Sequence, residues 1–103
     1  MLRQAFVMKL KLGALAEYTR HHDQLWSELA AEIRACGIKK IATFEDDPYL
    51  FLYSEVEDDG AWARLWDTEI HRKWGEIMVA LMEYGADGKV KAQFVKQVFN
   101  FDA

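Results

Sequence analysis

The sequence has few of the residues that build covalent or metal-linked frameworks. Among its 103 residues there is one cysteine, Cys36. A lone cysteine excludes an internal disulfide bond and a zinc cluster built from several cysteines. We therefore expect a chain that folds by packing alone and works in a reducing compartment, the cytoplasm.

The sequence also lacks the patterns of membrane and nucleic-acid-binding proteins. No apolar stretch approaches the roughly 20 residues of a membrane-spanning helix. Residues 1–9 lack the apolar segment and small-residue cleavage site of a signal peptide. Thirteen Lys and Arg residues against 17 Asp and Glu residues give a net charge of −4. This mild acidity disfavours nucleic acid or an anionic membrane as the partner.

Apolar residues are abundant, at 51% of the chain, and they are regularly spaced. The length and composition predict one domain over residues 1–103. Alternating apolar residues predict strands at residues 4–12, 38–45, 49–57 and 92–101. Apolar residues at steps of three and four predict a helix at 14–35 and a helical region at 61–81. In that second region, Asp67 and Thr68 can cap a new helix after a break near Trp66.

This order of elements, β-α-β-β-α-β, predicts an α+β fold of the ferredoxin-like type. Such a fold has a four-stranded antiparallel sheet with both helical regions on one face. Each predicted strand carries sizeable residues on both faces, so an uncovered second face would expose an apolar patch. Two sheets packed face to face would cover that patch and form a dimeric α+β barrel. We therefore predict a homodimer.

The first predicted helix carries a histidine on its inward face. Its inward stripe is Leu15, Tyr18, His22, Leu25, Leu29 and Ile33. At about 100° per residue, His22 lies near the centre of this stripe and His21 at its edge. Tyr18 lies one turn before His22 on the same face. An inward histidine needs a hydrogen-bond partner or a ligand that supplies one. Spacing alone leaves open both a satisfied core histidine and a proton-transfer residue.

The remaining histidines and tryptophans have simpler predicted roles. We expect His21 to be solvated at the edge of the stripe. His71 lies three residues before Trp74, which permits a place in a pocket, but we expect it to lie on the surface. A zinc site built from all three histidines is disfavoured, because adjacent residues project about 100° apart on a helix, so we predict no metal site. The tryptophans expected to anchor the core are Trp26, Trp62 and Trp66.

Three segments of the sequence carry specific combinations of residues. They are Arg3-Gln4-Ala5-Phe6-Val7-Met8, then Glu17-Tyr18-x-Arg20-x-His22-x-x-x-Trp26-x-Glu28-Leu29, and then Trp62, Thr68, Arg72-Lys73-Trp74 and Met78. In these segments the chain resembles the L-rhamnose mutarotase family, and the resemblance covers nearly the whole chain, most clearly residues 3–82. The resemblance implies a dimeric ferredoxin-like enzyme that interconverts the α and β anomers of L-rhamnose. It also implies that no metal or cofactor is needed and that the partner is a monosaccharide.

The resemblance further implies roles for individual residues. His22 occupies the position of the family's proton donor, and Tyr18 and Trp74 occupy positions that contact the sugar. Opening a pyranose ring needs a proton delivered to the ring oxygen and one removed from the anomeric hydroxyl, and closing reverses both. Histidine suits this task because it can donate and accept near neutral pH. We expect His22 to protonate the ring oxygen, Tyr18 to hydrogen-bond a hydroxyl, and Trp74 to offer a flat apolar surface.

The chain departs from the family at three places. Ile41 stands where the family usually has a tyrosine that contacts the sugar, and Gly75 stands where a second tryptophan often follows the first. The loop at residues 83–89 also differs from the family's loop. Ile41 is still predicted to line the substrate site. Such changes can alter substrate preference by a few kcal/mol, so L-fucose or another aldose remains an alternative substrate. A cofactor-free oxygenase and a ligand-binding dimer of the same fold also remain open.

Overall fold

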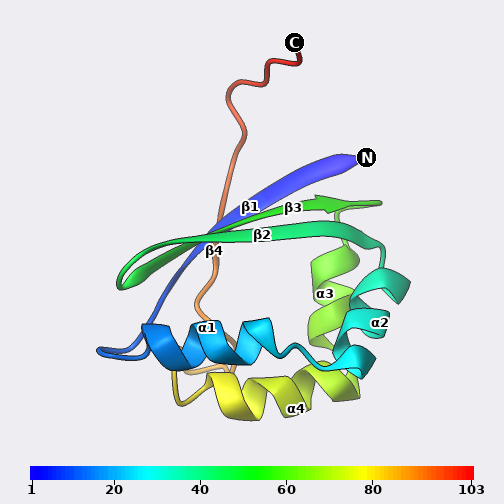
Figure 1. The fold of residues 1–103 in the computed structure, drawn as a ribbon. Coiled ribbons are helices and arrows are strands. Elements are labelled where there is room, and N and C mark those ends of the chain that lie inside the picture. The colour runs from blue at the N-terminus through cyan, green and yellow to red at the C-terminus, as the bar shows by residue number, and fades with distance from the viewer.

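The computed structural model describes residues 1–103 as one four-stranded sheet covered by helices on one face (Figure 1). The strands are β1 (Leu2–Lys9), β2 (Ile38–Asp46), β3 (Tyr49–Val56) and β4 (Gln93–Val95). The helices are α1 (Leu15–Asp23), α2 (Ser27–Ala35), α3 (Ala61–Trp66) and α4 (Glu69–Met78). The strand order is β2-β3-β1-β4, and every pair is antiparallel. This confirms the predicted α+β ferredoxin-like fold. None of the helices is long and apolar enough to cross a bilayer.

The face of the sheet under the helices forms the hydrophobic core. Phe6 of β1 lies opposite Leu52 of β3, and both side chains are buried. The edge of the Trp62 ring from α3 packs on Phe6, with ring centroids 5.0 Å apart. The Trp62 Nε1 donates to Ser54 Oγ at 2.9 Å, and that hydroxyl donates to the Gln4 carbonyl at 2.7 Å. The Trp62 and Ser54 side chains therefore satisfy each other's polar atoms in the core, whereas the buried Oε1 of Gln4 makes no hydrogen bond.

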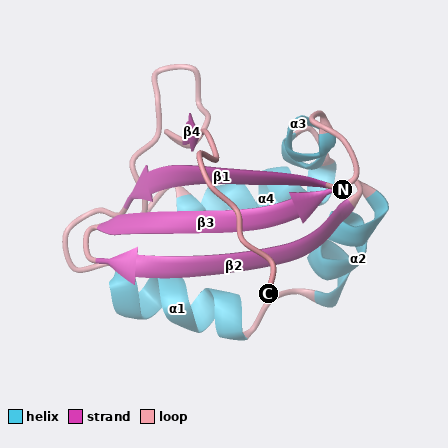
Figure 2. Cartoon of the chain, turned by 90° about the horizontal axis from the view of Figure 1, so that it is seen from above, coloured by secondary structure: helices cyan, strands magenta, loops and turns pink.

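The other face of the sheet carries no helix (Figure 2). The strand register brings Val7, Phe51 and Phe44 side by side on it. Phe44 is 65% exposed and Phe51 is 43% exposed. The predicted apolar second face is therefore present on the single chain.

The predicted helix at 14–35 is wrong in one respect, because it is broken into α1 and α2 at residues 24–26. Trp26 takes an extended backbone conformation, with φ −62° and ψ 136°. Its ring packs edge-on against Trp74, with centroids 5.2 Å apart. Residues 24–26 include no glycine or proline, the residues that usually interrupt a helix. The break instead coincides with the long-range contact between Trp26 and Trp74. Leu25, which was predicted to face inward, is 37% exposed.

Gly37 follows α2 and is required there for two reasons. Its φ is +91°, a conformation that residues with a Cβ rarely adopt. A Cβ at this position would also lie 3.0 Å from Glu57 Oε2. The helix therefore ends where the sequence predicts, and the chain turns directly into β2.

The second helical region divides into α3 and α4 at the predicted break. Thr68 begins α4, and its Oγ1 accepts a hydrogen bond from the His71 backbone N–H at 3.3 Å. This cap satisfies one of the free donors at the start of the helix. It also fixes the register that buries Trp74 and Met78 against the core.

The last strand is much shorter than predicted. Residues 92–101 alternate as a strand does, yet only Gln93–Val95 pair with β1. Beyond them the chain runs away from the sheet (Figure 1), and Val98, Phe99 and Phe101 are 95%, 78% and 75% exposed. The alternation of apolar residues predicts which side chains would share a face of a strand. It does not show whether a neighbouring strand is available to pair with these residues. The first strand also differs slightly from prediction, since it spans Leu2–Lys9 rather than 4–12.

Candidate active site

A cavity of about 260 Å³ lies between the sheet and the helices. Of the 18 residues that line it, 16 are hydrophobic and the other two are His22 and His71. The four residues predicted for the site all line this cavity: Tyr18, His22, Ile41 and Trp74. Its volume equals that of about nine water molecules at about 30 Å³ each. The cavity therefore suits one small ligand, held by apolar walls and a few polar groups.

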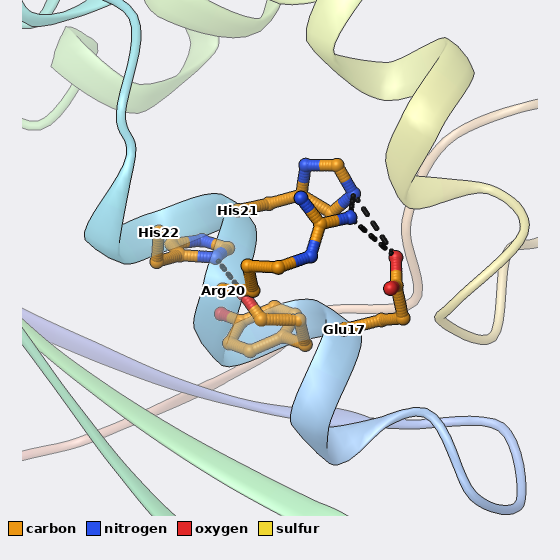
Figure 3. A network of polar contacts seen from close by, with 5 residues as sticks. Glu17, Arg20, His21 and His22 are labelled. Carbon is orange, nitrogen blue, oxygen red and sulfur yellow. Dashed lines mark hydrogen bonds and ion pairs between the residues drawn. The ribbon is translucent and has the colours of Figure 1, made fainter.

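His22 is held in one orientation by its own helix (Figure 3). Its Nδ1 lies 2.8 Å from the backbone carbonyl oxygen of Tyr18, one turn earlier in α1. A carbonyl oxygen can only accept, so Nδ1 must carry the hydrogen. In the neutral ring the lone pair is then on Nε2. This nitrogen makes no hydrogen bond to the protein, and it is not among the fully buried atoms that lack a partner, so it is accessible. His22 therefore presents an accessible proton-accepting nitrogen at the cavity.

Two aromatic rings contact the imidazole of His22. The Tyr18 ring stacks on it with centroids 4.0 Å apart, and Trp74 meets it edge-on at 5.1 Å. Burial in these surroundings lowers the pKa of His22 below its ordinary value, and the hydrogen bond to the Tyr18 carbonyl offsets part of that shift. His22 is therefore neutral at neutral pH.

The Tyr18 side chain is buried and keeps its proton. Burial raises the pKa of Tyr18 to about 12, and an interaction with Thr43 of β2 offsets this slightly. At neutral pH its hydroxyl is therefore a hydrogen-bond donor.

The neighbouring His21 takes part in a polar network outside the cavity (Figure 3). The His21 side chain is 22% exposed, and its ring lies edge-on to Trp74 with centroids 6.3 Å apart. Its Nε2 lies 3.4 Å from Glu17 Oε2, and Arg20 Nη2 lies 2.9 Å from the same oxygen. Arg20 lowers the pKa of the Glu17 carboxyl by hydrogen bonding to it. His21 does not line the cavity, which confirms its predicted place at the edge of the stripe. No three His, Cys, Asp or Glu side chains gather as potential metal ligands.

Trp74 and Ile41 complete the predicted set. Trp74 is buried, and its ring contacts both His22 and Trp26. Ile41 lies on the edge strand β2 and is 38% exposed, so it stands at the rim of the cavity. An isoleucine offers no hydrogen bond, so this rim is apolar.

Two further cavity residues were not predicted, His71 and Tyr84. The expectation that His71 lies on the surface is wrong, because it lines the cavity and burial lowers its pKa to about 4. A signal was present, since His71, Trp74 and Met78 are spaced as one face of a helix. Tyr84 comes from the segment after α4, and nothing in its local sequence indicates the cavity.

The comparisons with known proteins agree with this geometry. Residues 3–101 match the family model of L-rhamnose mutarotase. The L-rhamnose mutarotase of Bacillus subtilis strain 168 is 34% identical over 104 residues, covering 99% of this chain and 100% of that protein. The crystal structure of L-rhamnose mutarotase from Formosa agariphila has a TM-score of 0.87 at 31% identity, covering 99% and 100% of the two chains.

A more distant structure shares the fold alone. It is a dimeric ferredoxin-like protein from an uncultured marine organism, with a TM-score of 0.62 at 14% identity, covering 98% of this chain and 97% of that one. The similarity to L-rhamnose mutarotases is much stronger, because both the sequence and the structure match over almost the full length of both chains. The oxygenase and ligand-binding alternatives rest on fold analogy or spacing and have no support of this kind. The chain therefore belongs to the L-rhamnose mutarotase family, whose members are carbohydrate isomerases.

Proposed function

We propose that this protein exchanges the α and β anomers of L-rhamnose or a closely related deoxy-aldose, with His22 as the acid/base. One observation carries the proposal. The His22 Nδ1–H is anchored to the Tyr18 carbonyl, which leaves the basic Nε2 free in a cavity of about 260 Å³. A free imidazole nitrogen in a mostly apolar cavity of this size suits proton transfer on one sugar ring.

The neutral state of His22 decides the order of the proton transfers. Nε2 accepts the proton of the anomeric hydroxyl, the bond from the anomeric carbon to the ring oxygen breaks, and the ring oxygen takes that electron pair and a proton from water. The product is the open aldehyde. The first role of His22 is therefore that of a base. This order differs from the sequence-based expectation of ring-oxygen protonation by His22, because a neutral Nε2 has no proton to give.

Ring closure uses the same group in reverse. Rotation about the bond between C1 and C2 presents the other face of the aldehyde, and the former ring oxygen attacks it. The protonated His22 returns its proton to the carbonyl oxygen as the hydroxide left by the opening step takes the proton of the attacking hydroxyl and becomes water again. One histidine thus serves as base and then acid, as microscopic reversibility requires.

The other three residues would position the sugar. The protonated Tyr18 hydroxyl donates to a sugar hydroxyl, and Trp74 supplies an apolar wall for the C–H bonds of the ring. Ile41, at the rim, packs against an apolar edge such as the methyl group of a 6-deoxy sugar.

The direct test measures anomer exchange by NMR magnetisation transfer with L-rhamnose, L-fucose, L-lyxose and D-mannose. We expect L-rhamnose to be accelerated most, because the chain belongs to the L-rhamnose mutarotase family. The methyl group that the apolar rim accommodates should favour L-rhamnose and L-fucose over L-lyxose and D-mannose. Faster exchange of L-fucose would keep the reaction and change the sugar. Exchange of all four sugars at the rate of buffer alone would refute the proposed function.

We also propose that the protein is a homodimer in which the uncovered sheet faces pack together and close a barrel. The support is the apolar row at Phe44, Phe51 and Val7 on that face. Light scattering at micromolar concentration should give twice the chain mass, and Phe51→Lys should reduce it to one. A single-chain mass for the unaltered protein would refute this. Its one cysteine, the buried and unpaired Cys36, is consistent with the cytoplasm as the proposed compartment.

A further inference from the structure

The cavity has a second group of polar side chains, which do not come from the helix that carries His22. His71 lines it from α4, and Tyr84 lines it from the segment that follows α4. Both residues also line a second hollow of about 480 Å³ next to the cavity. They therefore stand at the boundary between the two spaces.

The ring of His71 has no task within the protein. Its backbone N–H is used by Thr68, but neither ring nitrogen makes a hydrogen bond to a protein group. Neither ring nitrogen is among the fully buried polar atoms that lack a hydrogen-bond partner. The ring nitrogens are therefore accessible at the cavity wall, where a polar group without a protein partner is available to a ligand.

The Tyr84 hydroxyl lies next to α4 at Gly75. A Cβ at Gly75 would lie 3.7 Å from this hydroxyl, an ordinary van der Waals contact, so the hydroxyl packs directly against this part of the helix. This hydroxyl also makes no hydrogen bond to the protein, and burial raises the pKa of Tyr84, which keeps it protonated. The wall thus offers a hydroxyl beside an imidazole.

The size of the cavity links this wall to the reaction. A space of about 260 Å³ has room for one sugar ring with its substituents, and His22 and His71 both line it, so one bound ring can contact both histidines. An aldose carries hydroxyl groups around its ring. Those directed away from His22 lose hydrogen bonds to water on binding, and this costs affinity unless the protein replaces them.

We propose that His71 binds the aldose through a hydrogen bond to a ring hydroxyl remote from His22 and determines specificity at that hydroxyl, with the Tyr84 hydroxyl beside it. This inference rests on the proposed function and names a recognition residue for it. Because burial lowers the pKa of His71 to about 4, its ring is neutral at neutral pH and offers one donor and one acceptor. His71 acts in binding, and it does not carry the transferred proton.

The test compares variants of His71 in the anomer-exchange experiment. His71→Phe keeps a flat ring and removes both nitrogens, so we expect kcat/KM for the best sugar to fall about 10- to 100-fold. His71→Gln keeps a donor and an acceptor and should stay within about five-fold of the unaltered protein. The matched control is His21→Gln, since His21 lies outside the cavity and should change the rate less than about two-fold.

Specificity provides the readout that a purely structural role would not move. Sugars that differ in configuration at one ring carbon should be discriminated by the unaltered protein. His71→Phe should bring one of these ratios close to unity and leave the others unchanged. The loss should be the same at pH 6 and pH 8, roughly, because a neutral hydrogen-bonding group does not titrate there. Tyr84→Phe should lower kcat/KM less, by about two- to ten-fold.

Several results would overturn the inference. A folded His71→Phe protein with unchanged rates and ratios would do so, as would a His71→Gln protein as impaired as His71→Phe. If His71→Phe does not fold, an unchanged Tyr84→Phe protein together with a fully impaired His71→Gln protein would refute it. An unaltered protein that accelerates no aldose would refute the proposed function and this inference together. An active protein insensitive at His71 would refute this inference alone.

Discussion

The two walls of the cavity differ in how their polar groups are held. On the α1 wall, the His22 Nδ1 is fixed by the carbonyl of a residue one turn away, and the ring is stacked on Tyr18. On the α4 wall, the ring nitrogens of His71 and the hydroxyl of Tyr84 make no hydrogen bonds to the protein. Proton transfer needs a fixed tautomer and orientation, whereas recognition needs groups free to bond the ligand. This difference supports the proposal that His22 of α1 transfers the proton and that His71 of α4 binds a sugar hydroxyl.

The largest expected effect comes from removing the fixed base. His22→Gln should lower the rate of anomer exchange about 10²- to 10⁴-fold, the usual contribution of a general acid/base. His21→Gln is the matched control, because it removes the adjacent histidine from the polar network with Glu17. A His22→Gln protein within ten-fold, roughly, of the unaltered rate would place the chemistry elsewhere.

The next effect concerns the contact that joins the walls. Trp74 of α4 packs against His22 of α1 and against Trp26, with centroid separations of 5.1 Å and 5.2 Å. Trp74→Ala should reduce the free energy of unfolding in urea by about 3–5 kcal/mol, as large-to-small core changes do. Arg72→Ala, an exposed change on the same helix, should cost less than about 1 kcal/mol. Equal losses of unfolding free energy for the two variants would show that the packing of Trp74 between α1 and α4 does not stabilise the fold.

The third prediction concerns how the stability of the folded chain depends on pH through His71. The pKa of His71 is about 4 in the folded chain, against an ordinary value of 6.5. The unfolded chain therefore binds the proton more tightly, and stability that is present above pH 6.5 is lost as the pH falls towards 4.

The size of this effect follows from the same pKa shift. Between these limits His71 contributes about 3 kcal/mol to the free energy of unfolding, and the lowered pKa of His22 adds a loss of the same sign. Urea unfolding at pH 7 and at pH 4.5 should show a smaller pH-dependent loss for His71→Phe than for the unaltered protein. Equal losses for the two proteins would contradict the burial of His71.

The smallest expected effect is at the rim. Ile41→Tyr places a hydroxyl beside an otherwise apolar edge, and β2 can accommodate it because Ile41 is 38% exposed. One added hydrogen bond is worth about 1 kcal/mol, so KM for L-rhamnose should fall about five-fold with kcat unchanged. Ile41→Phe is the control that adds the ring without the hydroxyl. Equal effects of the two substitutions would assign the change to packing.

Much of this architecture was predictable from the sequence, because it depends on local periodicity. The period of two gave the sheet, and the step of three and four placed Tyr18 and His22 on one face of α1. Their hydrogen bond and ring stacking are contacts within a single turn of helix, so spacing alone could indicate them. The break before α4 was predictable for the same reason, since Thr68 caps its own helix.

The remaining features depend on contacts between distant parts of the chain. The break at Trp26 accompanies its contact with Trp74, 48 positions later, and no residue near the break marks it. The length of β4 depends on how much of β1 is available for pairing. Tyr84 lines the cavity from the segment after α4, and its hydroxyl packs next to Gly75 of that helix. Tyr84 was therefore not predicted, because it comes from a loop. The helical spacing of His71 from Trp74 does indicate that His71 can line the cavity.

The central claim is that the free Nε2 of His22 is the base that limits anomer exchange. The most direct measurement is a ¹⁵N NMR titration of the histidine side chains, made alongside the exchange rate on the same protein. The hydrogen bond to Tyr18 predicts that neutral His22 carries its proton on Nδ1. Burial predicts that the pKa of His22 is below its ordinary value, and the exchange rate should fall with the same midpoint as the pH is lowered. A His22 that carries its proton on Nε2, or a rate that stays constant while His22 titrates, would contradict the claim.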